Sequence, residues 1–197
     1  MTTLPRQVAF EFCSLCNWAW YCWQFHAALF HENSREDELR PTAAGHALGR
    51  LSVMTQGYGM LEVSKLHDPA GTGDRTTLGI DYIVKHGGWS PTTQATLESL
   101  HGQLDGFAHK VLRGARNKSI CHNDLASILA GKRLGAFDLK DGEEYFARLQ
   151  QFAQLVWQEV TGDEFPFDEN GAFEGKALIG AIGPADRIPR AETPIPR

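Results

Sequence analysis

The sequence is poor in strand-like alternation, in net positive charge and in paired cysteines, and each absence excludes a class of protein. Apolar and polar residues alternate nowhere at length, which excludes an all-β fold. The formal net charge of -5 excludes a polybasic protein and leaves only local binding of nucleic acid. The cysteines form no disulfide framework, because three stand in one segment and the fourth stands alone: Cys13, Cys16, Cys22 and Cys121.

The N-terminal region also lacks the features of a targeting or membrane segment. Residues 8–30 are rich in Phe, Trp and Leu, but Glu11, Asn17, Gln24 and His26 interrupt the apolar run. Trp and Tyr prefer membrane interfaces to bilayer cores. No charged lead precedes a short apolar run with a small-residue cleavage site. We therefore expect a cytoplasmic protein with reduced thiols and no membrane partner.

Proline positions divide the chain into helical segments, because a helix interior tolerates proline poorly. Residues 6–31, 42–67 and 92–165 contain none. The first of these segments is apolar almost all round, which is typical of a helix buried between its own domain and a partner. In the second segment, apolar residues at steps of three and four predict one apolar face, formed by Leu51, Met54, Tyr58 and Leu61.

Turn and capping residues define the next helices. Residues 68–76 are rich in Pro, Gly and Asp and predict a loop, after which Thr76 or Thr77 can cap a short helix. Ser90 then supplies an N-cap, with Pro91 at the first helical position. The strongest helical pattern follows, with apolar residues at steps of three and four: Leu97, Leu100, Leu104, Phe107 and Val111.

The last long helix is predicted to begin at a capping-box-like pair, Asp141 and Glu144. Its apolar residues repeat the same pattern: Tyr145, Leu149, Phe152, Val156 and Val160. The chain then turns to Pro, Gly and charge, with a weakly helical run at 172–181. We predict an all-α bundle of four main helices plus a short helix over residues 1–162, and a Pro/Gly-rich, partly disordered C-terminal extension over residues 163–197.

A basic segment lies at the end of the strongest helix. Residues 106–123 contain no Asp or Glu, although the rest of the chain is acidic. The segment holds four cations and two histidines: Lys110, Arg113, Arg116, Lys118, His109 and His122. This contrast predicts an anion-binding site. The alternative is a solvated helix end whose cations complement the helix dipole.

Two motifs in the chain resemble one known family. Arg116 and Asn117, followed by four residues and His122, have the spacing of the HEPN superfamily signature, and their surroundings resemble its abortive-infection (AbiU-type) branch. The run SKLHDPAGTG at 64–73 is similar to the Lys-Leu-x-Asp-Pro helix ending of that branch. The resemblance extends over roughly residues 8–160. It implies a HEPN-like helical bundle that pairs as a homodimer and, as in many members, a metal-independent endoribonuclease.

These residue types suit RNA cleavage without a metal. His122 can accept or donate a proton near neutral pH. The planar fork of Arg116 matches phosphate oxygens, and Asn117 can donate to such an oxygen or orient His122. The resemblance implies that Arg116 and His122 are catalytic, with Asn117 assisting them, and the charge of the basic segment predicts RNA binding by Lys110, Arg113 and Lys118. Three residues are candidates for supporting roles: Lys65, Asp68 and His109. A helix-end ion pair and a turn before Pro69 explain the first two structurally as well.

The spacing within the motif constrains its geometry. On one ideal helix, six residues place Arg116 and His122 about 120° apart. Either the helix breaks near residues 114–119, or two chains contribute across a two-fold axis. The resemblance favours the second route.

No metal and no cofactor is expected. Cys13 and Cys16 have a zinc-like spacing but no second ligand pair, so we interpret them as core residues. His26 and His31 are expected at the surface or at an interface. The expected partners are RNA, a second copy of the chain and, for a toxin, an antitoxin. An alternative from another class is a non-catalytic nucleotide- or RNA-binding or dimerisation module paired with a nucleotidyltransferase antitoxin.

Overall fold

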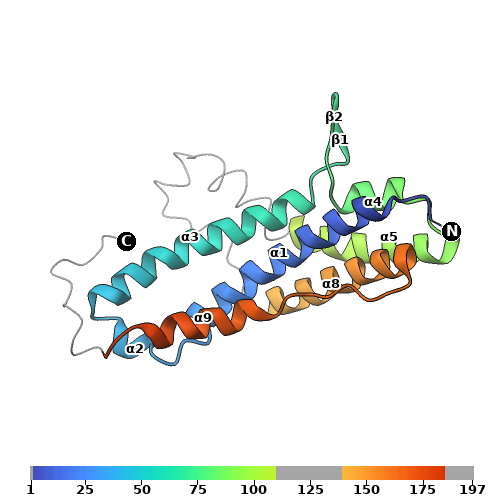
Figure 1. The fold of residues 1–197 in the computed structure, drawn as a ribbon. Coiled ribbons are helices and arrows are strands. Elements are labelled where there is room, and N and C mark those ends of the chain that lie inside the picture. Colours follow the sequence, from blue (N-terminus) through green and yellow to red (C-terminus); the bar gives the residue numbers. More distant parts are fainter. Residues whose placement is uncertain (1, 110–138, 185–197) are drawn as a thin grey trace. The chain divides into compact units, whose positions relative to one another are not determined.

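A computed structural model describes residues 2–109 and 139–184, and this part of the chain is all-α apart from one short hairpin (Figure 1). The chain divides into two compact units, Met1–Trp20 with Met60–Phe167 and Tyr21–Gly59 with Asp168–Arg197. Two long helices, α1 (Arg6–Phe30) and α3 (Ala43–Leu66), contribute residues to both units. The predicted all-α fold is confirmed. In the described residues no helix is long and apolar enough to cross a membrane.

The first unit is built around α5 (Pro91–Phe107), which packs against α4 (Ile80–His86) and α8 (Leu139–Thr161). Its core is made of fully buried apolar and aromatic side chains from α1, α4, α5 and α8: Phe12, Ile80, Ile83, Leu97, Leu104, Tyr145, Phe146, Leu149 and Phe152. The rings of Phe12 and Phe152 meet edge to face at 5.7 Å, a favourable arrangement for two aromatic quadrupoles. Burial of these helix faces stabilises the unit.

The start of α5 forms as its residues dictate. The Ser90 side chain accepts a hydrogen bond from the Thr93 backbone N–H at 3.2 Å, and Pro91 occupies the first turn. Such a cap satisfies one of the free N–H groups at a helix start. Just before it, the Trp89 indole donates to the Ile83 carbonyl at 2.9 Å and so links α4 to the cap. The predicted N-cap is confirmed.

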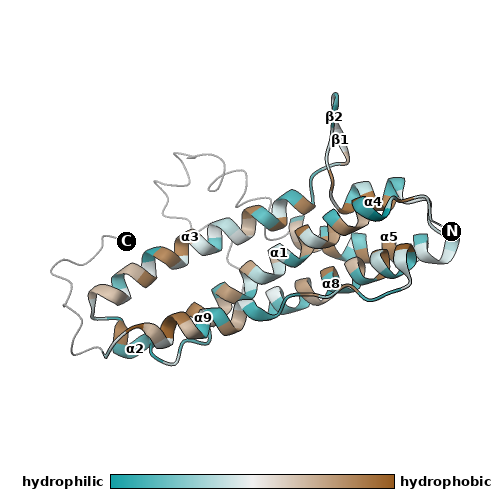
Figure 2. Ribbon diagram, in the orientation of Figure 1, coloured by the Kyte–Doolittle hydropathy of each residue, from teal (hydrophilic) through white to brown (hydrophobic). Residues whose placement is uncertain are grey.

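The starts of α8 and α4 differ from the predictions. Leu139 is already helical, so Asp141 lies in the first turn of α8 and is not its N-cap. Asp141 there favours the helix through the dipole. The apolar face predicted for α8 is confirmed at Tyr145, Leu149, Phe152 and Val156, whereas Val160 is only partly buried, and Figure 2 shows hydrophobic and hydrophilic residues alternating along this helix. For α4, the N-cap is Gly79 without a side-chain bond, so neither Thr76 nor Thr77 caps it.

The connection between α3 and α4 contains the described strands, β1 (Gly71–Thr72) and β2 (Arg75–Thr76). They pair antiparallel, with Gly71 opposite Thr76, and the hairpin extends away from the helices of this unit (Figure 1). Gly73, in the turn, has φ of 62°, a conformation that glycine adopts without steric cost. The segment predicted as a loop is therefore a tight hairpin.

The second unit contains the C-terminal half of α1, α2 (Glu36–Leu39), the N-terminal part of α3, and α9 (Asn170–Ala181). The last helix covers the helical run predicted at 172–181. It lies close against α1, because a Cβ placed on Gly171 would stand 2.7 Å from the Tyr21 carbonyl oxygen and one on Gly175 would stand 2.8 Å from the Ala28 Cβ. Glycine at both positions permits this approach. The Tyr21 hydroxyl also donates to Glu174 on α9.

The face predicted for α3 is wrong. Met54 and Tyr58 are 69% and 46% exposed, whereas Met60, Val63 and Leu66 are buried. The apolar residues of the predicted face recur at helical steps, but packing selects a different side of the helix at its C-terminal end. Periodicity shows that an apolar face exists without showing which neighbour covers it.

Candidate functional site

The predicted catalytic motif follows α5 directly in the sequence. α5 ends at Phe107, and Ala108 caps it through hydrogen bonds to the carbonyls of Asp105 and Leu104. The residues of the motif and the predicted RNA-binding cations lie outside the described residues: Lys110, Arg113, Arg116, Asn117, Lys118 and His122. The structure therefore describes the end of α5 and the polar residues around it.

A partly buried polar chain of side chains joins three helices at this end of α5. His67, just beyond the last residue of α3, has its Nδ1 2.9 Å from Asp105 Oδ1 on α5. Its Nε2 lies 3.0 Å from the Tyr145 hydroxyl on α8. The His67 side chain is only 8% exposed, and Tyr145 is fully buried. Both ring nitrogens of a buried histidine are thus satisfied, which removes the penalty of an unpaired polar atom.

The pKa shifts of Asp105 and Tyr145 indicate which groups of this polar chain donate hydrogen bonds and which accept them. The hydrogen bond from His67 lowers the pKa of Asp105, with the nearby charges of His101 and His67 adding to the effect. Asp105 is therefore an ionised acceptor near neutral pH, and His67 Nδ1–H donates to it. Burial raises the pKa of Tyr145 well above its ordinary value. Tyr145 therefore keeps its hydroxyl proton near neutral pH and can donate it to His67 Nε2.

Asp105 also faces histidines of its own helix segment. His101 Nε2 lies 3.2 Å from Asp105 Oδ2, one turn earlier on α5. The charge of His109, one turn later, contributes to the lowered pKa of Asp105. One carboxylate thus interacts with three imidazoles at the point where the chain leaves α5. The arrangement can hold the orientation of this helix end and compensate protonation of its histidines.

The supporting residues predicted from the sequence lie around this chain. Lys65, in the last turn of α3, forms an ion pair with the buried carboxylate of Glu62. Asp68 donates its backbone N–H to the Lys65 carbonyl at 3.2 Å, in the turn that ends α3. This ion pair supports the interpretation of Lys65 as a structural residue at the end of α3. The structure brings the His109 end of α5 to the Lys65 end of α3 through the contact between His67 and Asp105.

Sequence reasoning missed His67, His101, Asp105 and Tyr145 as a group. Tyr145 was counted only as part of an apolar face, and its hydroxyl gives it a second role. One sequence signal points to His67, because this residue occupies the variable position of the Lys-Leu-x-Asp-Pro run. A second signal is Asp105, an acidic residue between the apolar residues Leu104 and Phe107 of the predicted helix. Only the fold shows that these positions meet.

The other candidate residues have structural roles. Cys13 and Cys16 are fully buried, and the Cys13 thiol lies 3.4 Å from the Ala153 carbonyl oxygen, which confirms their interpretation as core residues. Burial raises the pKa of Cys13 to about 12. His26 is buried and not at the surface: its Nδ1 lies 2.8 Å from the Thr55 hydroxyl. Among residues 2–109 and 139–184, no group of three side chains could hold a metal ion.

The comparison with protein families identifies the class to which the chain belongs. The helical fold of the described residues and the match to a family model together place the chain in the HEPN class. The family model HEPN_AbiU2, described as AbiU2, matches residues 6–178. The match covers most of the chain, and the chain belongs to this family. Neither a curated protein nor a solved structure matches it.

Proposed function

We propose that this protein is a metal-independent endoribonuclease of the toxin or phage-defence kind. The observation that carries the proposal is the spacing of Arg116, Asn117 and His122 in a chain of the HEPN_AbiU2 family. Arg and His are the two side chains that phosphodiester cleavage needs most when no metal is used. One is always charged, and the other titrates near neutral pH.

The chemistry assigns a role to each residue. An unprotonated His122 accepts the proton of the ribose 2′-hydroxyl as that oxygen attacks the adjacent phosphorus. The bond from phosphorus to the 5′-oxygen breaks, and a protonated imidazole gives its proton to this leaving oxygen. The products are a 2′,3′-cyclic phosphate and a 5′-hydroxyl. Arg116 stabilises the extra negative charge on the phosphoryl oxygens in the transition state.

A homodimer supplies both imidazoles, since two copies of the motif face each other across a two-fold axis. Exposed apolar side chains on α1 support pairing: Phe10, Leu15 and Trp18 remain 45%, 38% and 44% exposed. Exposed apolar side chains gathered on one helix are typical of an interaction surface. One His122 then acts as the base and the other as the acid.

The polar chain at the end of α5 supports the same site. Asp105 and His67 hold the helix end from which the basic segment continues. Lys110, Arg113 and Lys118 add positive charge along that segment, which attracts the RNA backbone. His109, Lys65 and Asp68 lie near this helix end in supporting positions.

The test is RNA cleavage in the presence of EDTA. The full chain is incubated with total RNA, and His122→Ala is compared with His86→Ala, which removes an exposed histidine of α4. Chelator-resistant cleavage by the wild type and by His86→Ala, with none by His122→Ala, supports the proposal. Binding of RNA without any cleavage would instead favour a non-catalytic module with an antitoxin partner.

A further inference from the structure

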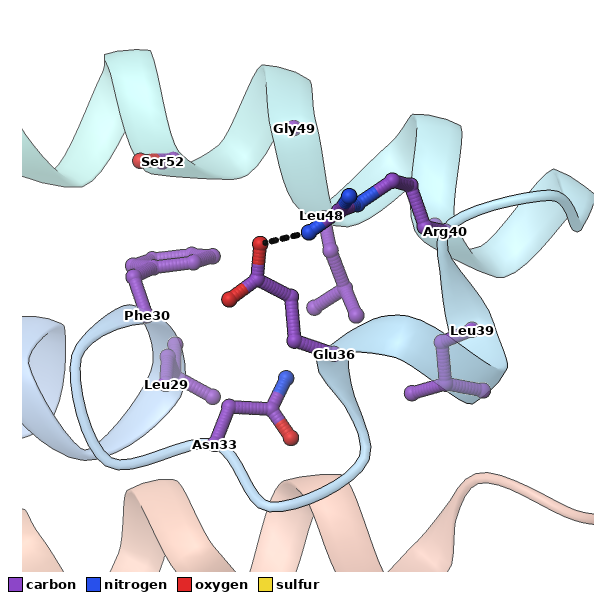
Figure 3. Close-up of a pocket in the computed structure, with 10 residues that line it drawn as sticks. Leu29, Phe30, Asn33, Glu36, Leu39, Arg40, Leu48, Gly49 and Ser52 are labelled. Carbon is purple, nitrogen blue, oxygen red and sulfur yellow. Dashed lines mark hydrogen bonds and ion pairs between the residues drawn. The ribbon is translucent and has the colours of Figure 1, made fainter.

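We infer that a pocket in the second unit binds a small organic cation with an apolar body, such as an arylalkyl amine. The pocket has a volume of about 300 Å³, at the lower end of the range for small-molecule sites. It is formed by the end of α1, the following loop, α2 and the start of α3 (Figure 3). Its lining residues are Leu29, Phe30, Asn33, Glu36, Leu39, Arg40, Gly45, Leu48, Gly49 and Ser52.

Local hydrogen bonds hold the pocket walls in place. The Thr42 hydroxyl donates to the Leu39 carbonyl and accepts from the Gly45 N–H, which fixes the turn between α2 and α3. A Cβ on Gly45 would stand 2.2 Å from the Leu39 carbonyl oxygen, so only glycine permits this close approach. The Asn33 side-chain oxygen accepts from the Arg35 N–H at 2.9 Å and shapes the loop on the other side. The pocket is therefore preformed.

The Arg35 side chain adds to this rigidity. Its guanidinium forms an ion pair with Glu38 and donates to backbone carbonyl oxygens at the end of α9, those of Ile179, Ile182 and Gly183. Arg35 is not a lining residue of the pocket, and these partners satisfy its positive charge. The loop that carries Asn33 is anchored at the same time.

One part of the pocket is apolar. Leu29, Leu39 and Leu48 line it, and the ring of Phe30 lies beside the Glu36 carboxylate in Figure 3. Leu29 and Leu39 are fully buried and give the wall a fixed shape. Such a wall removes the hydrocarbon part of a ligand from water.

The polar part of the pocket contains an ion pair between Glu36 and Arg40. The Glu36 carboxylate stands in the middle of the view in Figure 3, and its Oε1 accepts from Arg40 Nη2 at 2.9 Å. Arg40 also forms an ion pair with Asp37 at 3.2 Å. Two carboxylates therefore share one guanidinium, and the trio retains a negative charge. Among the described residues, Glu36 Oε2 has no hydrogen-bond partner.

This combination selects a cationic ligand. An ammonium group can donate to Glu36 Oε2, with the hydroxyl of Ser52 in the same lining as a further acceptor. The face of Phe30 attracts a cation through its quadrupole. Asp37 pairs with Arg40 from outside the lining, so the three side chains together are negative and disfavour a carboxylate or phosphate at Glu36. This site does not depend on the proposed ribonuclease activity, because it uses none of the residues assigned to cleavage.

The test is calorimetric titration of the full chain with 2-phenylethylammonium chloride and, separately, with sodium 3-phenylpropionate. The two probes have a similar apolar body and opposite charge. We expect the ammonium to bind with a Kd on the order of 1 mM or tighter and the carboxylate to bind at least tenfold more weakly. Equal binding of both probes, or binding of neither, overturns the inference.

Variants locate the binding in the pocket. Glu36→Gln should weaken binding of the ammonium at least tenfold, and Arg40→Gln should strengthen it, because the whole carboxylate becomes available. Gly49→Leu should abolish it, since Gly49 lines the pocket and a Cβ there meets no atom within 4 Å. The matched control is Gly57→Leu on the same helix, with equally open space and no part in the lining. A Gly49→Leu protein that binds like Gly57→Leu contradicts the assignment.

Discussion

His67 Nδ1 lies 2.9 Å from Asp105 Oδ1, and this one contact ties the end of α3 to the end of α5. Tyr145 extends the contact to α8 through the other ring nitrogen. Three helices that are far apart in the sequence are thereby joined by hydrogen-bonded side chains. This contact stands immediately ahead of the basic segment in the sequence, and we expect its loss to lower the stability of the fold.

Removal of the Tyr145 hydroxyl tests this joint. Tyr145→Phe keeps the ring in the core but leaves the Nε2 of the buried His67 without its donor. We expect the free energy of unfolding to fall by about 1–2 kcal/mol, measured by urea denaturation. Tyr82→Phe is the control on the partly exposed α4 surface, and it should change stability much less. Equal losses in the two variants would show that the hydrogen bond contributes nothing.

The helix positions were predictable from the sequence, whereas contacts between helices were not. Ser90 and Pro91 identify a helix start from local chemistry alone, and the structure confirms it. The buried side of α3 depends on which elements pack against it, and periodicity does not contain that information. Asp141 has the sequence spacing of an N-cap. Leu139 and Lys140, which precede it, are already helical, so α8 begins before Asp141. The pairing of His67 with Asp105 depends on tertiary packing in the same way.

The buried His26 predicts a loss of stability in mild acid. Burial, with the nearby charge of His31 as a second cause, lowers the pKa of His26 to about 4 from 6.5. When the pH falls below the unfolded-state pKa of His26, the imidazole becomes protonated in the unfolded chain but stays neutral in the folded chain. The free energy of unfolding should therefore fall by about 2 kcal/mol between pH 7 and pH 5. The measurement is urea denaturation at both pH values.

The variant His26→Gln isolates this contribution, because an amide can still bond to Thr55 and does not titrate. Its loss of stability between the two pH values should be smaller than that of the wild type. His31→Gln removes an exposed histidine and should retain most of the pH dependence. An unchanged pH dependence in His26→Gln would assign the effect to another group.

The approach of α9 to α1 predicts opposite effects for two glycines of one helix. Gly175→Ala places a methyl group 2.8 Å from the Ala28 Cβ, and the resulting overpacking should lower the free energy of unfolding by about 1–3 kcal/mol. Gly180→Ala meets no atom within 4 Å and should raise it by about 0.5–1 kcal/mol through helix propensity. Thermal and urea unfolding of both variants provide the comparison. The same sign for both changes would contradict the packing of α9.

The proposed homodimer predicts an effect of charge on α1. Trp18→Glu places a carboxylate on the exposed apolar face of this helix, and burial of an unpaired charge at an interface is unfavourable. We expect a dimer mass for the wild type and a monomer mass for the variant in light scattering at micromolar concentration. Phe173→Glu, on the exposed side of α9, should remain dimeric. A monomeric wild type would remove the basis for a shared cleft.

The most direct test of the central claim is single-turnover cleavage of an RNA oligonucleotide in EDTA, beside the same oligonucleotide with a 2′-deoxyribose at the cleaved position. We predict cleavage of the first to a 2′,3′-cyclic phosphate and no cleavage of the second. Arg116→Lys should slow the reaction by about 30- to 1,000-fold, a barrier increase of roughly 2–4 kcal/mol, while Asn117→Ala has a milder effect. Cleavage of the deoxy substrate at the same rate, or wild-type rates for Arg116→Lys and His122→Ala, would contradict the account.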